Sequence, residues 1–348
     1  MCVRKAVNEM LGSLAEDAGI RREDVFQVCV VGNTCMHHLF LGISPASLVH
    51  APYTPAVSER LVLNAGDYGL AVQERAELIM LPDIAGYVGA DTCGCLLAIR
   101  QDQQEEISLM IDIGTNGEMV LGNRERMVTC STAAGPAFEG AKIECGMRGA
   151  AGAVDHVKYE DGKWNYTTVG NKPAVGLCGS GLIDLVAGLL DAGMLDENGV
   201  LRSGQEKQSV FILVPPERGG NERGVYLTQK DLGEVQLAKA AIAAGIQMLM
   251  ERLGITEDDI CSVYIAGAFG NYMDPVSAGK IGLLPATLVK KVKPVGNAAG
   301  EGAKIALVNE KEMLEMDELV RKIEFVELAA SADFQDHFID ELGFETGE

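Results

Sequence analysis

Two stretches of the chain repeat one another and decide the fold. Residues 18–34 read AGIRREDVFQVCVVGNT, and residues 253–269 read LGITEDDICSVYIAGAF. Each stretch predicts a helix end, a Gly-Ile pair, an acidic turn and a buried apolar strand that stops at a glycine. The strands are expected at Val28–Val31 and Val263–Ala266, at a constant offset of 235 residues.

The flanking segments match in the same order. Helices with apolar residues at i, i+3 and i+4 are expected before the strands, at Val3–Ala18 and Leu237–Leu253. A Gly-rich turn feeding an Ala-rich helix follows each copy, at Pro82–Ile99 and Pro294–Leu307. Two matches in one order predict an internal duplication. We therefore expect two similar α/β halves that face each other across a cleft.

A strong hairpin signal lies between the copies, in Ser108–Gly122, which reads SLMIDIGTNGEMVLG. Asp112 ends a strand whose other residues are apolar, and a carboxylate there needs a partner. The successive backbone N–H groups from Gly114 to Gly117 predict an anion nest beside an acid that suits magnesium. The simpler alternative is that Asn116-Gly117 only closes the hairpin.

Charge and cysteine usage exclude several classes of function. The 348 residues carry 29 Lys and Arg against 50 Asp and Glu, a net charge of −21, which disfavours binding to nucleic acid or to an anionic membrane. No run reaches the ~18 apolar residues of a membrane span. Nine cysteines without a CxxC pair argue against a zinc site or a disulfide scaffold, and they favour a reducing cytoplasm. Residues 301–348 hold 14 acids and 4 bases, which predicts a solvated helical surface or, alternatively, a docking face for a basic partner.

Further motifs extend the pattern across residues 28–347 and carry a family resemblance. They are VVGNTCMHHLFLG (30–42), IDIGTNGEMVLG (111–122), STAAGPAFEGAKIECGMRGAAGAV (131–154), GLCGSGLIDLVAGLLDAGML (176–195) and YIAGAFGNYMDP (264–275). Together they resemble the superfamily of sugar kinases, heat-shock chaperone ATPases and actin, and more closely the ATP-dependent reductive activators of corrinoid proteins. The resemblance implies an α/β, actin-like (ribonuclease H-like) ATPase fold.

The resemblance also implies an activity, cofactors and partners. Such activators take an electron from an iron–sulfur cluster and pass it to an inactive cob(II)amide in a corrinoid methyl-transfer protein. ATP, bound with Mg²⁺, drives this uphill reduction to cob(I)amide. A homodimer is implied as well.

The superfamily roles carry over to matching positions of this chain. Asp112 would act in catalysis by holding magnesium or its water, and the hairpin would cradle phosphate through Gly114, Thr115, Asn116 and Gly117. The later glycine turn would receive adenosine through Gly267, Ala268, Phe269 and Gly270. Gly89 and Asp91 would contribute to the cofactor site at the hinge between the halves. A loop with Gly135, Pro136 and Glu139 would face the corrinoid protein. The alternative for Glu139 is a carboxylate placed at a helix N-terminus by the helix dipole.

The chain departs from the family in two respects. It lacks the cysteine spacing of an iron–sulfur site, so we expect no cluster here and a [2Fe-2S] cluster in a longer parent. The phosphate hairpin precedes Gly267 by about 150 residues, and the equivalent point for Gly32 falls before Met1. We therefore expect the first half to be incomplete and ATP hydrolysis by this chain alone to be weak.

These arguments predict three regions. Residues 1–107 would form the remnant of the first half, residues 108–290 the second half with its phosphate and adenosine loops, and residues 291–348 a hinge helix and an acidic helical tail. Two other functions stay open. One is a small-molecule kinase, for which the sequence offers no defensible base, and the other is a non-enzymatic fragment that docks a corrinoid protein or dimerises.

One further motif has two interpretations. Gly176, Gly179 and Gly181 precede an apolar helix, whose N-terminus is either an anion site or a point of tight helix packing.

Overall fold

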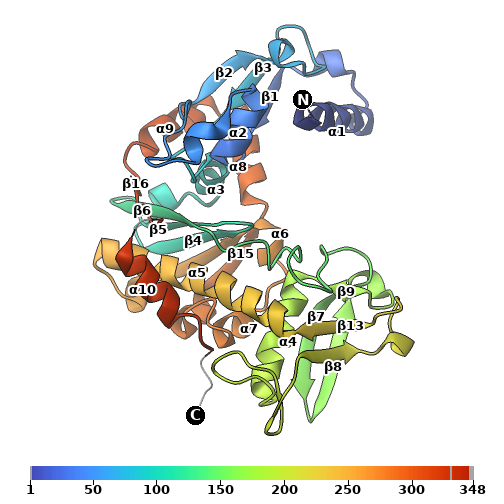
Figure 1. Cartoon of the computed structure of the whole chain (residues 1–348). Coiled ribbons are helices and arrows are strands. Elements are labelled where there is room, and N and C mark those ends of the chain that lie inside the picture. Colours follow the sequence, from blue (N-terminus) through green and yellow to red (C-terminus); the bar gives the residue numbers. More distant parts are fainter. Residues whose placement is uncertain (1, 330, 345–348) are drawn as a thin grey trace. The chain divides into compact units, whose positions relative to one another are not determined.

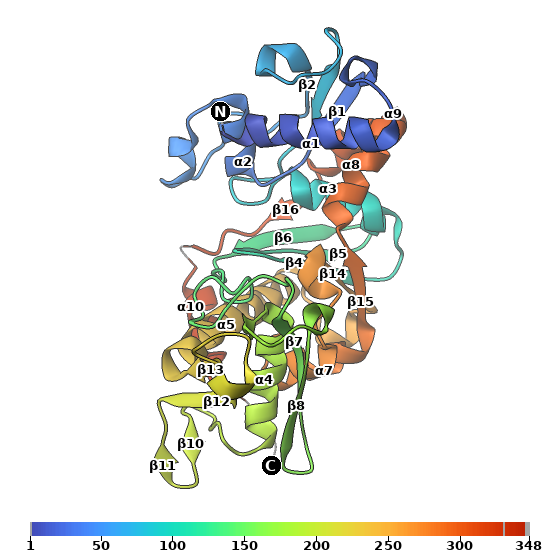
Figure 2. The same cartoon turned by 90° about the vertical axis from the view of Figure 1, so that its right-hand side faces the viewer.

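The computed structural model describes residues 2–329 and 331–344. The chain divides into two compact units, each described by itself below (Figures 1 and 2). The first unit comprises Met1–Glu105, Gly122–Thr129 and Asn297–Phe325, and the second comprises Glu106–Leu121, Cys130–Gly296 and Val326–Glu348.

The first unit is built on a small mixed sheet with the order β1-β3-β2. Its strands are β1 (Gln27–Val30), β2 (Leu61–Asn64) and β3 (Glu77–Met80), and β1 runs parallel to β3 while β2 runs antiparallel to it. Its helices are α1 (Cys2–Ala18), α2 (Thr34–Leu41), α3 (Ala90–Ile99), α8 (Ala298–Val308) and α9 (Glu310–Leu319).

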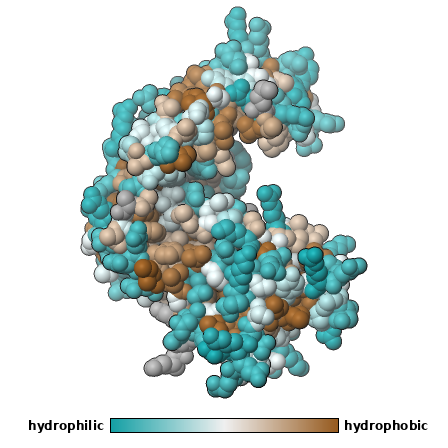
Figure 3. Space-filling model, in the orientation of Figure 1, coloured by the Kyte–Doolittle hydropathy of each residue, from teal (hydrophilic) through white to brown (hydrophobic). Residues whose placement is uncertain are grey.

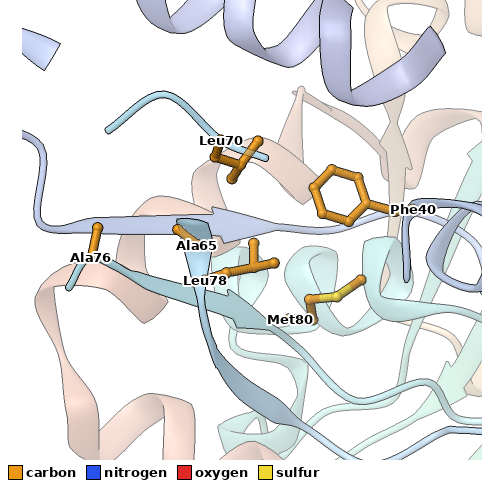
Figure 4. Packing of buried hydrophobic residues seen from close by; sticks show 6 residues of the cluster. All are labelled: Phe40, Ala65, Leu70, Ala76, Leu78 and Met80. Atoms are coloured by element: carbon orange, nitrogen blue, oxygen red, sulfur yellow. The ribbon is translucent and has the colours of Figure 1, made fainter. Parts of the chain in front are cut away.

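A buried apolar cluster holds this sheet to its helices (Figure 4). Its members are Phe40, Ala65, Leu70, Ala76, Leu78 and Met80. Val7 of α1 packs against the cluster together with Val28 and Val30 of β1. Full burial of a side chain such as Phe40, Leu78 or Met80 contributes about 1.5–3 kcal/mol, and Val7 fixes α1 to this cluster.

The second unit contains most of a larger sheet with the order β15-β14-β4-β5-β6-β16. These strands are β15 (Val292–Gly296), β14 (Ser262–Ala266), β4 (Ser108–Ile113), β5 (Gly117–Gly122), β6 (Met127–Thr132) and β16 (Glu324–Phe325). β14 is parallel to both β4 and β15, so the carboxyl ends of these three strands lie at one edge of the sheet.

Further elements surround this sheet. The helices are α4 (Gly179–Asp191), α5 (Gln229–Leu253), α6 (Gly267–Gly270), α7 (Pro275–Lys280) and α10 (Ala332–Asp340). The small strands are β7 (Ala153–Glu160), β8 (Lys163–Thr168), β9 (Gly176–Leu177), β10 (Arg202–Ser203), β11 (Glu206–Lys207), β12 (Val210–Val214) and β13 (Val225–Thr228).

The predicted duplication is confirmed in the order and conformation of the elements. The helix ends at Gly19 and Gly254 both adopt a left-handed backbone, with φ of 67° and 70°. Each is followed by a 3₁₀ turn, at Arg22–Asp24 and Glu257–Asp259, and then by β1 or β14 at the same offset of 235 residues. The next parallel neighbour of each strand, β3 or β15, leads into the Gly-rich turn and the helix α3 or α8.

The two Ala-rich helices of the repeat, α3 and α8, pack on each other through glycines. A Cβ atom added to Gly302 would lie 1.9 Å from the carbonyl oxygen of Gly94, and one added to Gly94 would lie 2.6 Å from that of Ala299. Only glycine allows backbones to approach so closely.

The helices α9 and α10 lie in the acidic C-terminal segment. α10 lies along α5, where Gln247 Nε2 donates to Glu341 Oε1 at 2.6 Å. In the described part of the chain, every helix is too short or too polar to cross a membrane.

Candidate functional site

Asp112 lies near the carboxyl end of β4, opposite Ala266 of β14. Its carboxylate is half-buried, and a Cβ atom on Gly267 would lie 3.1 Å from Asp112 Oδ1. Gly267 has φ of 86°, a conformation that favours glycine. Ligands of α/β sheets bind beyond the carboxyl ends of parallel strands, so Asp112 and Gly267 mark the candidate site.

The hairpin after Asp112 has the predicted strands β4 and β5. The Gly114 N–H donates to the Asn116 carbonyl oxygen at 2.9 Å, and Gly135 N–H donates to the Thr115 carbonyl oxygen at 2.8 Å. Because the Gly114 N–H serves the turn itself, an anion held here would use the amides after Gly114. At Gly117, a Cβ atom would lie 2.9 Å from Thr132 Oγ1, so the turn fits closely over β6.

Glu139 joins the loop of Gly135 and Pro136 to this hairpin. Thr115 Oγ1 donates to Glu139 Oε2 at 3.0 Å, while Glu139 Oε1 lies 3.6 Å from the Cβ position of Gly114. Glu139 is exposed and lies in an irregular turn outside any helix. The helix-dipole explanation for Glu139 is therefore wrong, and the carboxylate belongs to the surroundings of the hairpin.

An aromatic pair connects the same loop to α6. The rings of Phe138 and Phe269 stack with centroids 5.7 Å apart at an interplanar angle of 22°. A Cβ atom on Gly179 would lie 2.1 Å from the Phe138 carbonyl oxygen and 2.8 Å from the Phe269 ring. Sequence reasoning missed Phe138, although an aromatic residue between Gly135 and Glu139 was a visible signal.

Packing also explains Gly176, which precedes α4, and Gly179 and Gly181 in its first turn. Cβ atoms on Gly176 and Gly181 would lie 2.6 and 2.2 Å from the carbonyl oxygens of Cys145 and Val154. Together with Gly179, these contacts support tight packing as the reason for the three glycines.

The remaining adenosine-loop residues lie in α6. A Cβ atom on Gly270 would lie 2.6 Å from Ile265 Cγ2, so the last residue of this helix packs tightly against β14. Ala268 lies within α6, and its side chain falls outside the described part of the structure.

Sequence reasoning also missed Glu118, a buried carboxylate one residue after the hairpin turn. It is 9% exposed, and Ser131 Oγ donates to its Oε1 at 3.2 Å. Burial, with Glu118 as a second cause, raises the pKa of the neighbouring Cys130 thiol well above its usual value. The signal was a charged residue inside the otherwise apolar strand GEMVLG.

Gly89 and Asp91 lie in the first unit, at the start of α3. A Cβ atom on Gly89 would lie 2.5 Å from Asn33 Cα, which explains the glycine. Asp91 is half-buried, and this burial raises the pKa of its carboxyl group. Nearby, His37 Nδ1 lies 3.2 Å from Asp83 Oδ2, and both side chains are buried. These residues form a polar cluster within the first unit.

In the second unit, the candidate ligand for magnesium is the Asp112 carboxylate, which lies beside the space that a side chain at position 267 would fill. No group of three or more His, Cys, Asp or Glu suited to a metal occurs in the described residues. Magnesium is often held through one or two carboxylates, with water and substrate phosphates as the other ligands. Asp112, next to Gly267, fits that mode of binding.

The structure combines a duplicated strand–turn–helix repeat with an Asp-x-Gly-Thr hairpin beside a glycine turn. This combination defines the ASKHA class of nucleotide-binding folds, the superfamily of sugar kinases, heat-shock chaperone ATPases and actin. Residues 106–348 match the family described as the C-terminal domain of RACo, the ASKHA domain, and residues 1–104 match the RACo middle region. The chain therefore belongs to the RACo family.

Named relatives support this placement. The corrinoid activation enzyme RamQ of Eubacterium limosum is 35% identical over 352 residues, covering 97% of this chain and 59% of RamQ. The [Co(II) methylated amine-specific corrinoid protein] reductase of Methanosarcina barkeri is 29% identical over 303 residues, covering 80% of this chain and 54% of the reductase.

A solved structure agrees with these relatives. The reductive activator for corrinoid, iron–sulfur protein has a TM-score of 0.89 and 38% identity, and the match covers 98% of this chain and 56% of that one. The chain thus spans somewhat more than half the length of each of these proteins.

Proposed function

We propose that this chain is the nucleotide-binding part of a reductive activator that uses ATP to drive the reduction of cob(II)amide to cob(I)amide in a corrinoid protein. The observation that carries the proposal is the match of residues 106–348 to the ASKHA domain of RACo, joined to the placement of Asp112 beside Gly267. The relatives named as corrinoid activators supply the substrate class.

The proposed reaction adds one electron to cobalt and breaks no bond in this chain. The electron comes from a reduced iron–sulfur cluster on another polypeptide segment, and ATP supplies the free energy. Bound Mg²⁺ would neutralise phosphate charge. The chain's own part is to hold the nucleotide: Asp112 orients magnesium or its water, the hairpin contacts phosphate, and the Gly267 turn leaves room for adenosine.

We propose that a conformational change couples ATP binding to the holding of the corrinoid partner. A ligand shifts an equilibrium between two states only by its different affinity for them. ATP would therefore act by favouring one arrangement of the activator in which its corrinoid partner is held for reduction. We propose a homodimer in the cytoplasm as the working form, and the free thiol state of all nine cysteines supports a reducing compartment.

Titration calorimetry of this chain with magnesium-ATP tests the proposal. Asp112→Ala should abolish micromolar binding or weaken it at least tenfold, whereas Asp258→Ala, at an exposed position of the same unit, should leave it unchanged. Hydrolysis by the chain alone should be far slower than ordinary enzymatic turnover.

Three outcomes contradict parts of this scheme. If the unmutated chain binds no nucleotide, the docking alternative replaces it, and a pull-down with a corrinoid protein that is indifferent to ATP would support that alternative. Equal binding by Asp112→Ala would remove Asp112 from the site. Rapid hydrolysis by the chain alone would refute the expectation that its hydrolysis of ATP is weak.

A further inference from the structure

A lysine lies beside the hairpin that carries Asp112. The Gly135 N–H donates to the Thr115 carbonyl oxygen at 2.8 Å, so the loop after β6 rests on the hairpin turn. Lys142 Nζ lies 3.8 Å from the Cβ position of Gly135, and among the described residues no other heavy atom, chain neighbours aside, lies within 4 Å of that position. The space beside Gly135 therefore opens toward an ammonium group.

Helix α5 anchors the backbone near this lysine. Two residues after Lys142, the Glu144 N–H donates to Asp231 Oδ1 at 2.9 Å, and Asp231 is fully buried. Asp231 is itself fixed by the capping box with Thr228 at the start of α5. The backbone around Lys142 is thus held in place, while the lysine side chain is 51% exposed and free to change its conformation.

The ammonium group of Lys142 is paired with a carboxylate on the second turn of α5. Lys142 Nζ lies 3.0 Å from Glu234 Oε2, and the Glu234 side chain is 22% exposed. Hydrophilic side chains are interspersed with apolar patches on the visible face of the second unit (Figure 3). Because water screens ion pairs at such a surface, they contribute little to stability. Lys142 can therefore leave Glu234 at small cost when another anion binds nearby.

Carboxylates gather around the same hairpin. Asp112 and Glu118 lie on its two strands, and Glu139 accepts a hydrogen bond from its Thr115 hydroxyl. ATP would add a polyphosphate, whose negative charge Mg²⁺ neutralises only in part. A lysine ammonium is a compact charge on a flexible stem and a common ligand of phosphate. The charge of the site thus favours a cation at the position where Lys142 lies.

We propose that Lys142 is a phosphate ligand of the nucleotide site. On binding of ATP, its ammonium group leaves Glu234 and pairs with the phosphates that the hairpin holds, and no covalent bond forms or breaks. Glu234 and the phosphates compete for the same ammonium group. This assignment rests on the proposed function, and it makes the loop that contains Gly135 part of the nucleotide site.

Titration calorimetry of the whole chain with magnesium-ATP tests the assignment. Lys142→Met should weaken binding about tenfold, because a charge-assisted contact to phosphate is lost. Lys142→Arg should restore most of the affinity, whereas Lys163→Met, at an exposed position of β8 in the same unit, should leave it unchanged. Added salt should weaken binding more steeply in the unmutated chain than in Lys142→Met, because salt screens the attraction that the variant lacks.

The variant Glu234→Gln separates phosphate binding from a structural role. If Lys142 binds phosphate, loss of its competing carboxylate should leave the affinity unchanged or raise it up to about fivefold. If the pair only anchors the loop, Glu234→Gln and Lys142→Met should weaken binding alike, and that result overturns the assignment. Unaltered affinity in Lys142→Met also overturns it while leaving the proposed function in place. Failure of the unmutated chain to bind magnesium-ATP would contradict the proposed function and this assignment together.

Discussion

Replacing Gly302 by alanine tests how closely α3 and α8 pack. The new Cβ atom would lie 1.9 Å from the Gly94 carbonyl oxygen and 2.4 and 2.5 Å from the Gly94 carbonyl carbon and Cα. Ordinary contact begins at about 3.4 Å, so the helices would have to separate by roughly 1.5 Å, against rigid backbone. Overpacking of this kind costs about 1–3 kcal/mol.

Helix propensity works in the opposite direction. Alanine in place of glycine in a helix interior gains about 1 kcal/mol. Because backbone atoms cannot rotate away, we take the upper end of the overpacking range, about 3 kcal/mol. Less the gain of about 1 kcal/mol in helix propensity, Gly302→Ala should lower the free energy of unfolding by about 2 kcal/mol. Gly233 provides the matched control, since it lies in α5 and no heavy atom lies within 4 Å of its Cβ position. Gly233→Ala should raise the free energy of unfolding by about 1 kcal/mol.

Urea unfolding followed by circular dichroism measures both variants, and hydrogen exchange reports whether the loss is concentrated in α3 and α8. The sign of the change in the free energy of unfolding shows whether the backbones of α3 and α8 are in contact. If Gly302→Ala stabilises the chain as Gly233→Ala does, the helices are not in backbone contact and the description of the first unit is wrong.

Two further predictions address the second unit. Gly267→Ala should weaken magnesium-ATP binding about tenfold in calorimetry. The φ of 86° strains an alanine by roughly 1–2 kcal/mol, and the added Cβ atom would crowd Asp112 Oδ1 at 3.1 Å. Unaltered affinity would remove Gly267 from the nucleotide site. Asp259 accepts hydrogen bonds from the Thr256 backbone and side chain, which lower the pKa of its carboxyl group. Its stabilising effect should therefore be present above the ordinary carboxyl pKa and be lost as the pH falls through the lower folded value. Asp259→Ala should destabilise the chain at neutral pH and match the parent in strong acid, and a deficit that stays constant with pH would contradict this reasoning.

Local patterns predicted the features that a short stretch of chain can specify. The helix–turn–strand repeat and the β4–β5 hairpin follow from periodicity and from Gly and Asn at turns. The offset of 235 residues was accurate, since both 3₁₀ turns occur at it, whereas the bounds were not: β1 is Gln27–Val30 instead of Val28–Val31, and α5 begins at Gln229 instead of Leu237.

The sequence did not reveal side-chain partners that meet only after folding. Thr115 and Glu139 are 24 residues apart, and their hydrogen bond depends on how an irregular loop returns to the hairpin. The stacking of Phe138 on Phe269 joins a loop to the helix α6, which is distant in the sequence. Glu118 was different, because its burial could be inferred from its place in an apolar strand.

The internal duplication allows the packing of the two units to be compared element by element. In the second unit, the meander β4–β6 supplies Asp112 and the hairpin, pairs with β14, and covers the apolar face of α5. This meander thus carries the candidate site residue Asp112 and also contributes to the packing of that unit. The first unit has the matching strand β1 and helix α1, and Val3, Met10 and Leu14 of α1 are exposed.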